Sequence, residues 1–147
     1  MSLTADDRLL IHEVIALHGH LCDASAYERF DEVFTPDLEV DVSDLGLRPV
    51  PAGDPSRSRL DAYIAVARNR GPGSTLAMLV TNIIVREDGD GARAWSKGLT
   101  VNQDGAVAGF TYEDQLVRTG QGWRIRRRKV SPRREPGRGL EPLVLPG

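Results

Sequence analysis

The chain has 147 residues, of which 40% are hydrophobic and 27% charged, with a formal net charge of −2. These values are typical of a single globular domain that buries a core, and the charge gives no sign of binding to nucleic acid or an anionic membrane. No run approaches the roughly 18 apolar residues of a membrane span. The acidic N-terminal stretch lacks the layout of a signal peptide, so we expect a cytoplasmic protein without membrane or nucleic-acid partners.

The cysteine and histidine content does not indicate a metal site. The single cysteine, Cys22, excludes an internal disulfide and a multi-cysteine zinc site, and the three histidines show no metal-ligand spacing. The sequence also has no phosphate-binding loop, dinucleotide fingerprint or metalloprotease motif. We therefore predict no metal and no cofactor.

The N-terminal part of the chain is predicted to be helical. Thr4 with Asp7 three residues later resembles a capping box, and apolar residues at helical spacing predict an amphipathic helix over residues 5–22. A short second helix is expected within residues 23–34 and should end at the Thr-Pro-Asp sequence of residues 35–37.

The middle of the chain combines a strand, a loop and a helix. Residues 38–43 alternate apolar and acidic side chains, which predicts a strand. Residues 46–57 carry three prolines and two glycines and are typical of a loop. Residues 58–70 again show helical periodicity and predict the third helix.

The second half of the chain is predicted to be β-structure. Four strands joined by Gly-rich turns of hairpin length indicate an antiparallel meander. The order of elements predicts an α+β domain over residues 1–132, with three N-terminal helices packed on a curved antiparallel sheet around a cone-shaped apolar hollow suited to a small ligand. Residues 133–147 form a Pro/Gly-rich tail. The strands are expected at residues 76–87, 92–102, 110–119 and 123–132.

Two residues near the end of the first helix are candidates for acid/base chemistry. On a helical wheel, Ile11, Val14 and Leu21 fall within roughly 60° of His18, so His18 should point inward, whereas His20 should face water. An inward histidine is either a core residue satisfied by one partner or an acid/base group that titrates near neutral pH.

Asp23 also has two interpretations. It follows the last helical turn, where it could cap the second helix. Alternatively it is a carboxylate at the pocket mouth beside His18, where partial desolvation by Leu21, Phe30 and Phe34 would favour its protonated form.

Several motifs together resemble a known family. They are the aspartate after the first helix, Phe-Thr-Pro-Asp at 34–37, Leu-Val-Thr-Asn at 79–82 and Gly-Trp-Arg-Ile at 122–125. Over about residues 5–130 the chain resembles the SnoaL-like branch of the nuclear transport factor 2-like superfamily. The resemblance implies a cone-shaped α+β barrel with an apolar pocket, commonly dimeric. It also implies a choice among polyketide cyclases, dehydratases, steroid isomerases, epoxide hydrolases and non-catalytic binding or association modules.

The resemblance assigns roles residue by residue. Asp23 matches the family's pocket aspartate, and His18 stands where many relatives have a pocket tyrosine. Met78 stands where dehydratase-like members usually have a histidine, and Asn102 lies near the position of another acid/base group in some dehydratases. Lys97 is not followed by an aspartate two residues on, so the relay of the epoxide hydrolases has no match.

Strand alternation adds further candidates. Tyr112 and Asp114 share one face of their strand, which is either the pocket side or an outer side. Asn82 lies in register with Val80 and Ile84, which makes an inward amide possible. The basic cluster that begins in residues 123–132 could attract phosphates, but a solvated sheet edge is the favoured interpretation.

The sequence and the resemblance together favour a cofactor-independent isomerase, cyclase or dehydratase that acts on an apolar, oxygenated polyketide- or steroid-like molecule. The resemblance also leads us to expect a homodimer. Asp23 and His18 would share the acid/base work, and Tyr112 and Asn82 would donate hydrogen bonds to the substrate oxygen. The alternative is a non-catalytic binding or subunit-association module. A third option, an epoxide hydrolase, would need Asp23 and a second carboxylate to flank a water. The further substrate-binding candidates are Phe34, Met78, Asp114 and Asn102.

Overall fold

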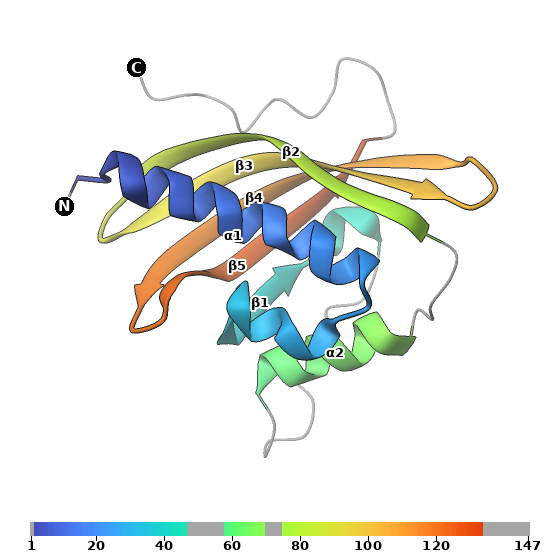
Figure 1. Cartoon of the computed structure of the whole chain (residues 1–147), viewed down its shortest axis with the longest axis horizontal. Coiled ribbons are helices and arrows are strands. Elements are labelled where there is room, and N and C mark those ends of the chain that lie inside the picture. Colours follow the sequence, from blue (N-terminus) through green and yellow to red (C-terminus); the bar gives the residue numbers. More distant parts are fainter. Residues whose placement is uncertain (1, 47–57, 70–74, 134–147) are drawn as a thin grey trace.

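A computed structural model describes residues 2–46, 58–69 and 75–133 of the chain. Helices and a five-stranded sheet make up this part of the molecule (Figure 1). The helices are α1 (Ala5–Asp23), the short 3-10 helices η1 (Tyr27–Glu32) and η2 (Ser43–Leu45), and α2 (Arg59–Asn69). The strands are β1 (Phe34–Asp41), β2 (Thr75–Asp88), β3 (Gly91–Asn102), β4 (Val107–Thr119) and β5 (Gly122–Pro132).

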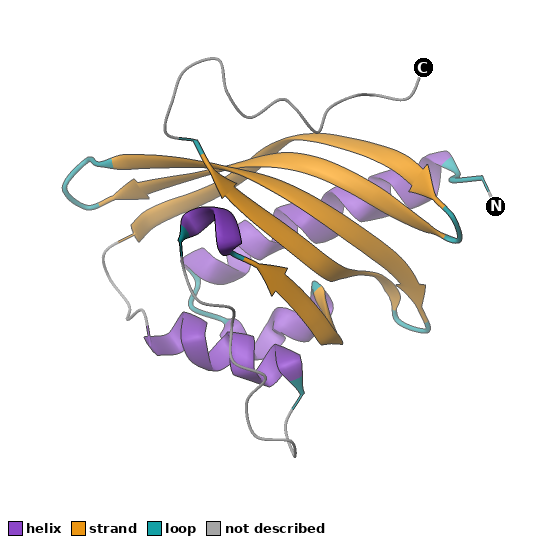
Figure 2. Ribbon diagram, turned by 180° about the vertical axis from the view of Figure 1, so that it is seen from behind, coloured by secondary structure: helices purple, strands orange, loops and turns teal. Residues whose placement is uncertain are grey.

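The strands form one sheet in the order β1-β5-β4-β3-β2. Strands β2 to β5 are an antiparallel meander, whereas β1 pairs with β5 in parallel. The sheet is curved. Within the described residues β1 and β2 are its two edges and do not pair with each other, so the sheet is open. Helix α1 lies across one face, called the inner face below, and is seen behind the sheet in Figure 2. No helix in this part of the chain has the length and apolar character needed to cross a membrane.

The predicted α+β class, the meander and both long helices are confirmed. The second helix predicted within residues 23–34 is shorter than expected. It spans only Tyr27–Glu32 and is a 3-10 helix. Strand β1 begins at Phe34, so the expected stop at residues 35–37 lies inside a strand. Pro36 is tolerated there because an edge strand can lack one backbone donor. Residues 47–57 of the predicted loop and residues 134–147 of the tail lie outside the described residues.

The first turn of α1 is fastened to the far end of the sheet. Thr4 and Asp7 form the predicted capping box, in which each side chain accepts a hydrogen bond from the other's backbone N–H. The Asp7 carboxylate also accepts a hydrogen bond from the Trp123 indole at 3.1 Å and pairs with Arg118 at 2.7 Å. The Thr4 backbone N–H and then the Trp123 indole lower the pKa of Asp7 to about 2.

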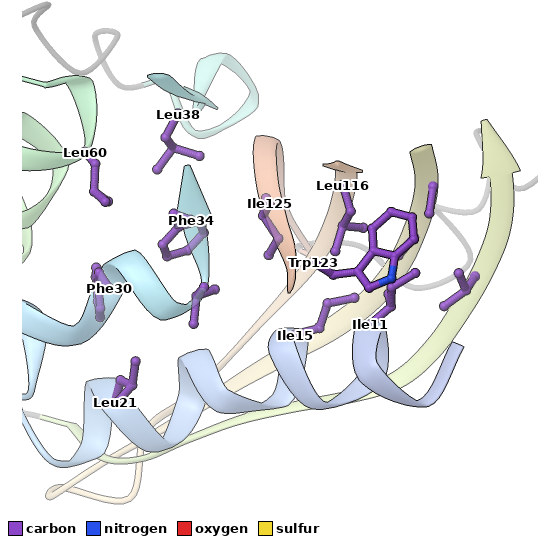
Figure 3. Packing of buried hydrophobic residues seen from close by; sticks show 14 of the residues in the cluster. Ile11, Ile15, Leu21, Phe30, Phe34, Leu38, Leu60, Leu116, Trp123 and Ile125 are labelled. Carbon is purple, nitrogen blue, oxygen red and sulfur yellow. The ribbon is translucent and has the colours of Figure 1, made fainter. Parts of the chain in front are cut away.

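The core lies between α1, η1, β1 and the inner face of the sheet (Figure 3). Its largest contributors come from elements far apart in the sequence, and Figure 3 shows Ile11 and Ile15 of α1 beneath Trp123. The other end of α1 approaches β2 closely at Gly19, where an added Cβ would lie 2.6 Å from the Met78 carbonyl oxygen. Any side chain at residue 19 would push the end of α1 away from the sheet.

Replacement of Asp7 by Asn should lower the melting temperature at pH 7, because it removes charge-assisted bonds to Trp123 and Arg118. A carboxyl group with a depressed pKa stabilises the fold above its ordinary pKa of 3.8, and this contribution disappears as the pH falls towards about 2. The difference in melting temperature between wild type and Asp7→Asn, followed by circular dichroism, should therefore shrink over that interval. Asp6→Asn, one residue earlier in the same turn and exposed, is the matched control. Equal losses at pH 7 for both variants would contradict this account.

Candidate functional site

Helix α1 places His18 in the interior. Its buried residues follow a helical stripe that includes Ile11, Ile15, His18 and Leu21. His18 is 3% exposed, whereas His20 faces solvent, so the predicted orientations are confirmed. The imidazole ring packs edge-on against Phe30 at 5.4 Å and Phe34 at 5.2 Å between ring centroids.

These rings belong to a larger aromatic set. Tyr27 of η1 contacts Phe30, and Tyr63 of α2 contacts both Phe30 and Phe34. Figure 3 shows Phe30 and Phe34 between α1 and the segment that carries Leu60. Aromatic side chains from η1 and β1 therefore pack on the buried histidine, and Tyr63 of α2 packs behind them.

A buried ion pair faces this aromatic set from the sheet. Asp114 of β4 and Arg128 of β5 are direct cross-strand partners. Arg128 donates from Nε and Nη2 to the two carboxylate oxygens of Asp114 at 2.7 and 2.8 Å, and both side chains are 1% exposed. The guanidinium also lies over the Tyr112 ring at 4.2 Å and the Phe34 ring at 5.5 Å. Tyr112 and Asp114 therefore lie on the inner face of the sheet. Strand alternation alone had left open whether their shared face was the inner or the outer one.

The charges of this cluster have clear causes. Burial disfavours the charged form of Arg128, but the Asp114 carboxylate outweighs it and the pKa of Arg128 lies above its ordinary value. Burial raises the pKa of Tyr112, so the phenol keeps its proton. The ion pair and the phenol together carry no net charge.

His18 is joined to the ion pair. Its Nδ1 lies 2.8 Å from Arg128 Nη1, and its Nε2 lies 3.4 Å from Cys22 Sγ. Burial and then the charge of Arg128 hold the pKa of His18 well below the ordinary value of 6.5. The imidazole is therefore neutral at physiological pH.

Asp23 does not join this cluster. One of the two interpretations of Asp23 was a partly desolvated carboxylate beside His18, but Asp23 is exposed. Its Oδ1 accepts a hydrogen bond from the backbone N–H of Met78 at 2.8 Å, which ties the end of α1 to β2. Met78 itself is half-buried. His18 and Asp23 thus stand at different depths and have different hydrogen-bond partners.

The two candidate amides also lie away from the cluster. Asn82 is exposed and has a φ of 55°, because the register of β2 shifts between Thr81 and Ile84. The irregularity breaks the alternation that made an inward amide possible, and the Asn82 side chain is instead exposed. Asn102 is half-buried at the end of β3, where its Oδ1 lies 3.4 Å from Thr75 Oγ1.

Sequence reasoning missed Arg128. Strict alternation from Ile125, which is fully buried, would turn Arg127 inward and Arg128 outward. The register of β4 and β5 shifts between Gln115 and Leu116, so Arg126 is an extra residue and the faces exchange beyond it. The available signal was the possible inward position of Asp114, because a buried carboxylate needs a cation near it.

Most of the other basic residues of β5 are paired with acids, whereas Arg124 donates to backbone carbonyl groups. Strand β5 lies between β1 and β4, so the interpretation of this segment as a sheet edge was wrong. Arg127 pairs with Asp41 at 3.2 Å, and Lys129 with Asp44 at 3.4 Å. Acids of β1 and η2 thus pair with Arg126, Arg127 and Lys129. In the described part of the chain, no three His, Cys, Asp or Glu side chains gather where they could hold a metal ion.

The pattern of the SnoaL-like domain matches the chain over residues 3–129. The chain belongs to the SnoaL-like family. An uncharacterized protein of Mycobacterium tuberculosis is 30% identical to this SnoaL-like protein over 130 residues, which cover 83% of this chain and 82% of that one. The resemblance inferred from the sequence motifs is confirmed.

Solved structures share the fold of this SnoaL-like protein. A nuclear transport factor 2-like protein with a cystatin-like fold from Novosphingobium aromaticivorans superposes with a TM-score of 0.71 at 23% identity, covering 97% of this chain and 90% of that one. A protein of the same organism named provisionally as a scytalone dehydratase gives a TM-score of 0.68 at 18% identity, with coverages of 92% and 99%. At these identities the likeness shows the fold alone.

Replacement of Asp114 by Asn should lower the free energy of unfolding by about 3–5 kcal/mol, because it leaves the Arg128 charge buried without its counter-ion. Urea denaturation at pH 7 measures this quantity. Glu39→Gln is the control, because Glu39 pairs with Arg59 at 3.3 Å but is 58% exposed, and such a pair contributes less than about 1 kcal/mol. A similar cost for both substitutions would show that the buried pair is not a main determinant of stability.

Proposed function

We propose that this SnoaL-like protein is a cofactor-independent acid/base enzyme that isomerises, cyclises or dehydrates an apolar, oxygenated ring compound. The observation that carries the proposal is the buried network of His18, Arg128 and Asp114 inside an aromatic interior. Replacing such a network by apolar residues is often neutral or stabilising, so its presence is better explained by chemistry than by stability.

The composition of the interior supports a neutral, ring-shaped substrate. The rings of Phe30, Phe34 and Tyr63 offer flat apolar surface. The charges of Arg128 and Asp114 cancel, and His18 is neutral, so the site holds no free charge for an ionic ligand. Because His18 is 3% exposed, a substrate reaches it only when the elements around it move apart.

The proposed chemistry is removal of a proton next to a carbonyl group. Asp23, which is exposed at the end of α1, would take the proton, and the electron pair would move onto the carbonyl oxygen. The neutral imidazole of His18 and the protonated phenol of Tyr112 would donate hydrogen bonds to that oxygen. Return of the proton elsewhere completes an isomerisation, attack on a second carbonyl a cyclisation, and departure of a hydroxyl group as water a dehydration.

The main alternative is a non-catalytic binding or association module, and the dense packing around His18 favours it. An epoxide hydrolase is less well supported. It would require Asp23 and Asp114 to flank a water, but Asp114 binds Arg128 through both oxygens and Asp23 lies at the surface.

A homodimer through the outer face of the sheet is part of the same proposal. Leu79 and Leu99 are direct cross-strand partners there and are 47% and 37% exposed. Val107 is 60% exposed on the next strand. The buried indole N–H of Trp95, on the same face as Leu99, has no hydrogen-bond partner among the described residues. An apolar face of this kind is typical of a contact between subunits.

The function is tested with aromatic polyketide-like ketones and steroid-like enones. A compound that binds the folded state raises the melting temperature of the protein. Asp23→Asn should still bind it, since an amide oxygen can accept the Met78 N–H, but turnover should be lost. Asp31→Asn, which changes an exposed carboxylate of η1, should retain turnover. Conversion by wild type and Asp23→Asn at equal rates would remove Asp23 from the mechanism. Binding without conversion by wild type would favour the binding module.

The dimer is tested by Leu99→Arg, which places a charge in the proposed contact. Size-exclusion chromatography with light scattering should show a dimeric wild type and a monomeric variant. Leu9→Arg is the matched control, because Leu9 is 65% exposed on α1 and should leave the dimer intact. A monomeric wild type would contradict this part of the proposal.

A further inference from the structure

The contact between Arg128 and His18 restricts the protonation state of the imidazole. A guanidinium has five N–H donors and no acceptor. Because Arg128 Nη1 lies 2.8 Å from His18 Nδ1, that nitrogen must accept the hydrogen bond through its lone pair. A neutral imidazole with its lone pair on Nδ1 carries its hydrogen on Nε2. Both the other tautomer and the imidazolium would set one N–H against another.

The second nitrogen then has a defined role. Nε2–H points to Cys22 Sγ at 3.4 Å, and the sulfur is the acceptor. His18 in this state cannot remove a proton from Cys22, so the pair is not arranged as a cysteine nucleophile with a histidine base. Sulfur is a weak acceptor. A carbonyl oxygen that reached this point would compete well for the same N–H.

The direction of the Arg128 fork is itself fixed. Asp114 holds Nε and Nη2, and the Tyr112 and Phe34 rings flank the guanidinium plane, so Nη1 can only project towards α1. A lysine ammonium has no planar fork and could not hold the carboxylate in two places while donating to a ring nitrogen in a set direction.

We propose that Arg128 and Asp114 are positioning residues that keep His18 as a neutral donor through Nε2. If the proposed function holds, this donor binds the substrate oxygen. The role of the donor therefore rests on the proposed function, whereas the fixed tautomer follows from the hydrogen-bond geometry alone. The titratable groups that contact His18 are Arg128 and Cys22, and those that act on Arg128 in turn are Asp114, Tyr112 and Tyr63. The charge nearest the imidazole is the Arg128 guanidinium, which disfavours protonation, and the Asp114 carboxylate is engaged by Arg128 through both oxygens.

The proposal is tested by long-range proton–nitrogen NMR of the full chain labelled with ¹⁵N-histidine, which identifies the protonated ring nitrogen. His18 should show only the Nε2–H form and no change between about pH 5 and 8, the interval in which an unperturbed imidazole titrates. His12 and His20 supply reference signals in the same spectra. An Nδ1–H form, or a protonated His18 at the acid end of this interval, would overturn the proposal.

Two variants separate the cause. Arg128→Lys keeps a buried cation but loses the fork, and should allow the Nδ1–H form or protonation to appear. Cys22→Ala removes the partner of Nε2 and should leave the tautomer unchanged. If Cys22→Ala shifts the tautomer, the sulfur sets it and the proposal fails. If Arg128→Lys does not fold, the wild-type spectra and Cys22→Ala still decide. A locked tautomer in a protein that converts no compound would refute the proposed function alone.

Discussion

A charged group buried away from water must be matched, and the fold meets this constraint at Arg128. The guanidinium is neutralised by Asp114, covered by Tyr112 and Phe34, and joined to α1 through His18. These partners come from β4, β1 and α1, so a single side chain specifies how three elements sit relative to β5. Apolar packing is tolerant of small shifts, whereas a bidentate pair between two side chains with 1% exposure is not. The interior is therefore defined by polar geometry as well as by volume.

Two close approaches set the position of α1 over the sheet. At its start, Asp7 is held by Trp123 and Arg118. At its end, Gly19 allows the helix backbone to approach β2, and Asp23 accepts the Met78 N–H. His18 lies between these attachments, and its depth follows from them. Asp23, the last residue of α1, binds β2 from an exposed position, whereas His18 one turn earlier is buried.

Local sequence patterns predicted the helices and strands. The site was not fully predicted, because it depends on how strands distant in the sequence pair with one another. Helix α1 and strands β2 to β5 follow from apolar periodicity and glycine turns, which are properties of short windows. Alternation also placed Tyr112 and Asp114 on one common face, but only the structure shows that this face is the inner one. Alternation could not place Arg128, because the bulge at Arg126 exchanges the faces of β5, and a bulge depends on how two strands fit together. Asn82 was misplaced by a similar irregularity in β2. The parallel partnership of β1 and β5 joins distant segments and leaves no local signal.

That partnership also governs the order in which the chain can fold. Phe34 pairs with Ile125, so β1 has no neighbour in the sheet until the last strand has formed. The apolar face of α1 is likewise not fully buried until Trp123 and Ile125 pack with Ile11 and Ile15. Bringing β1 and β5 together closes a long loop of chain, and the entropy lost in doing so precedes the contacts that compensate for it. Such long-range pairing slows folding. During synthesis on the ribosome, the acidic first strand therefore emerges long before its basic partner, and the native sheet is completed only after β5 has been made.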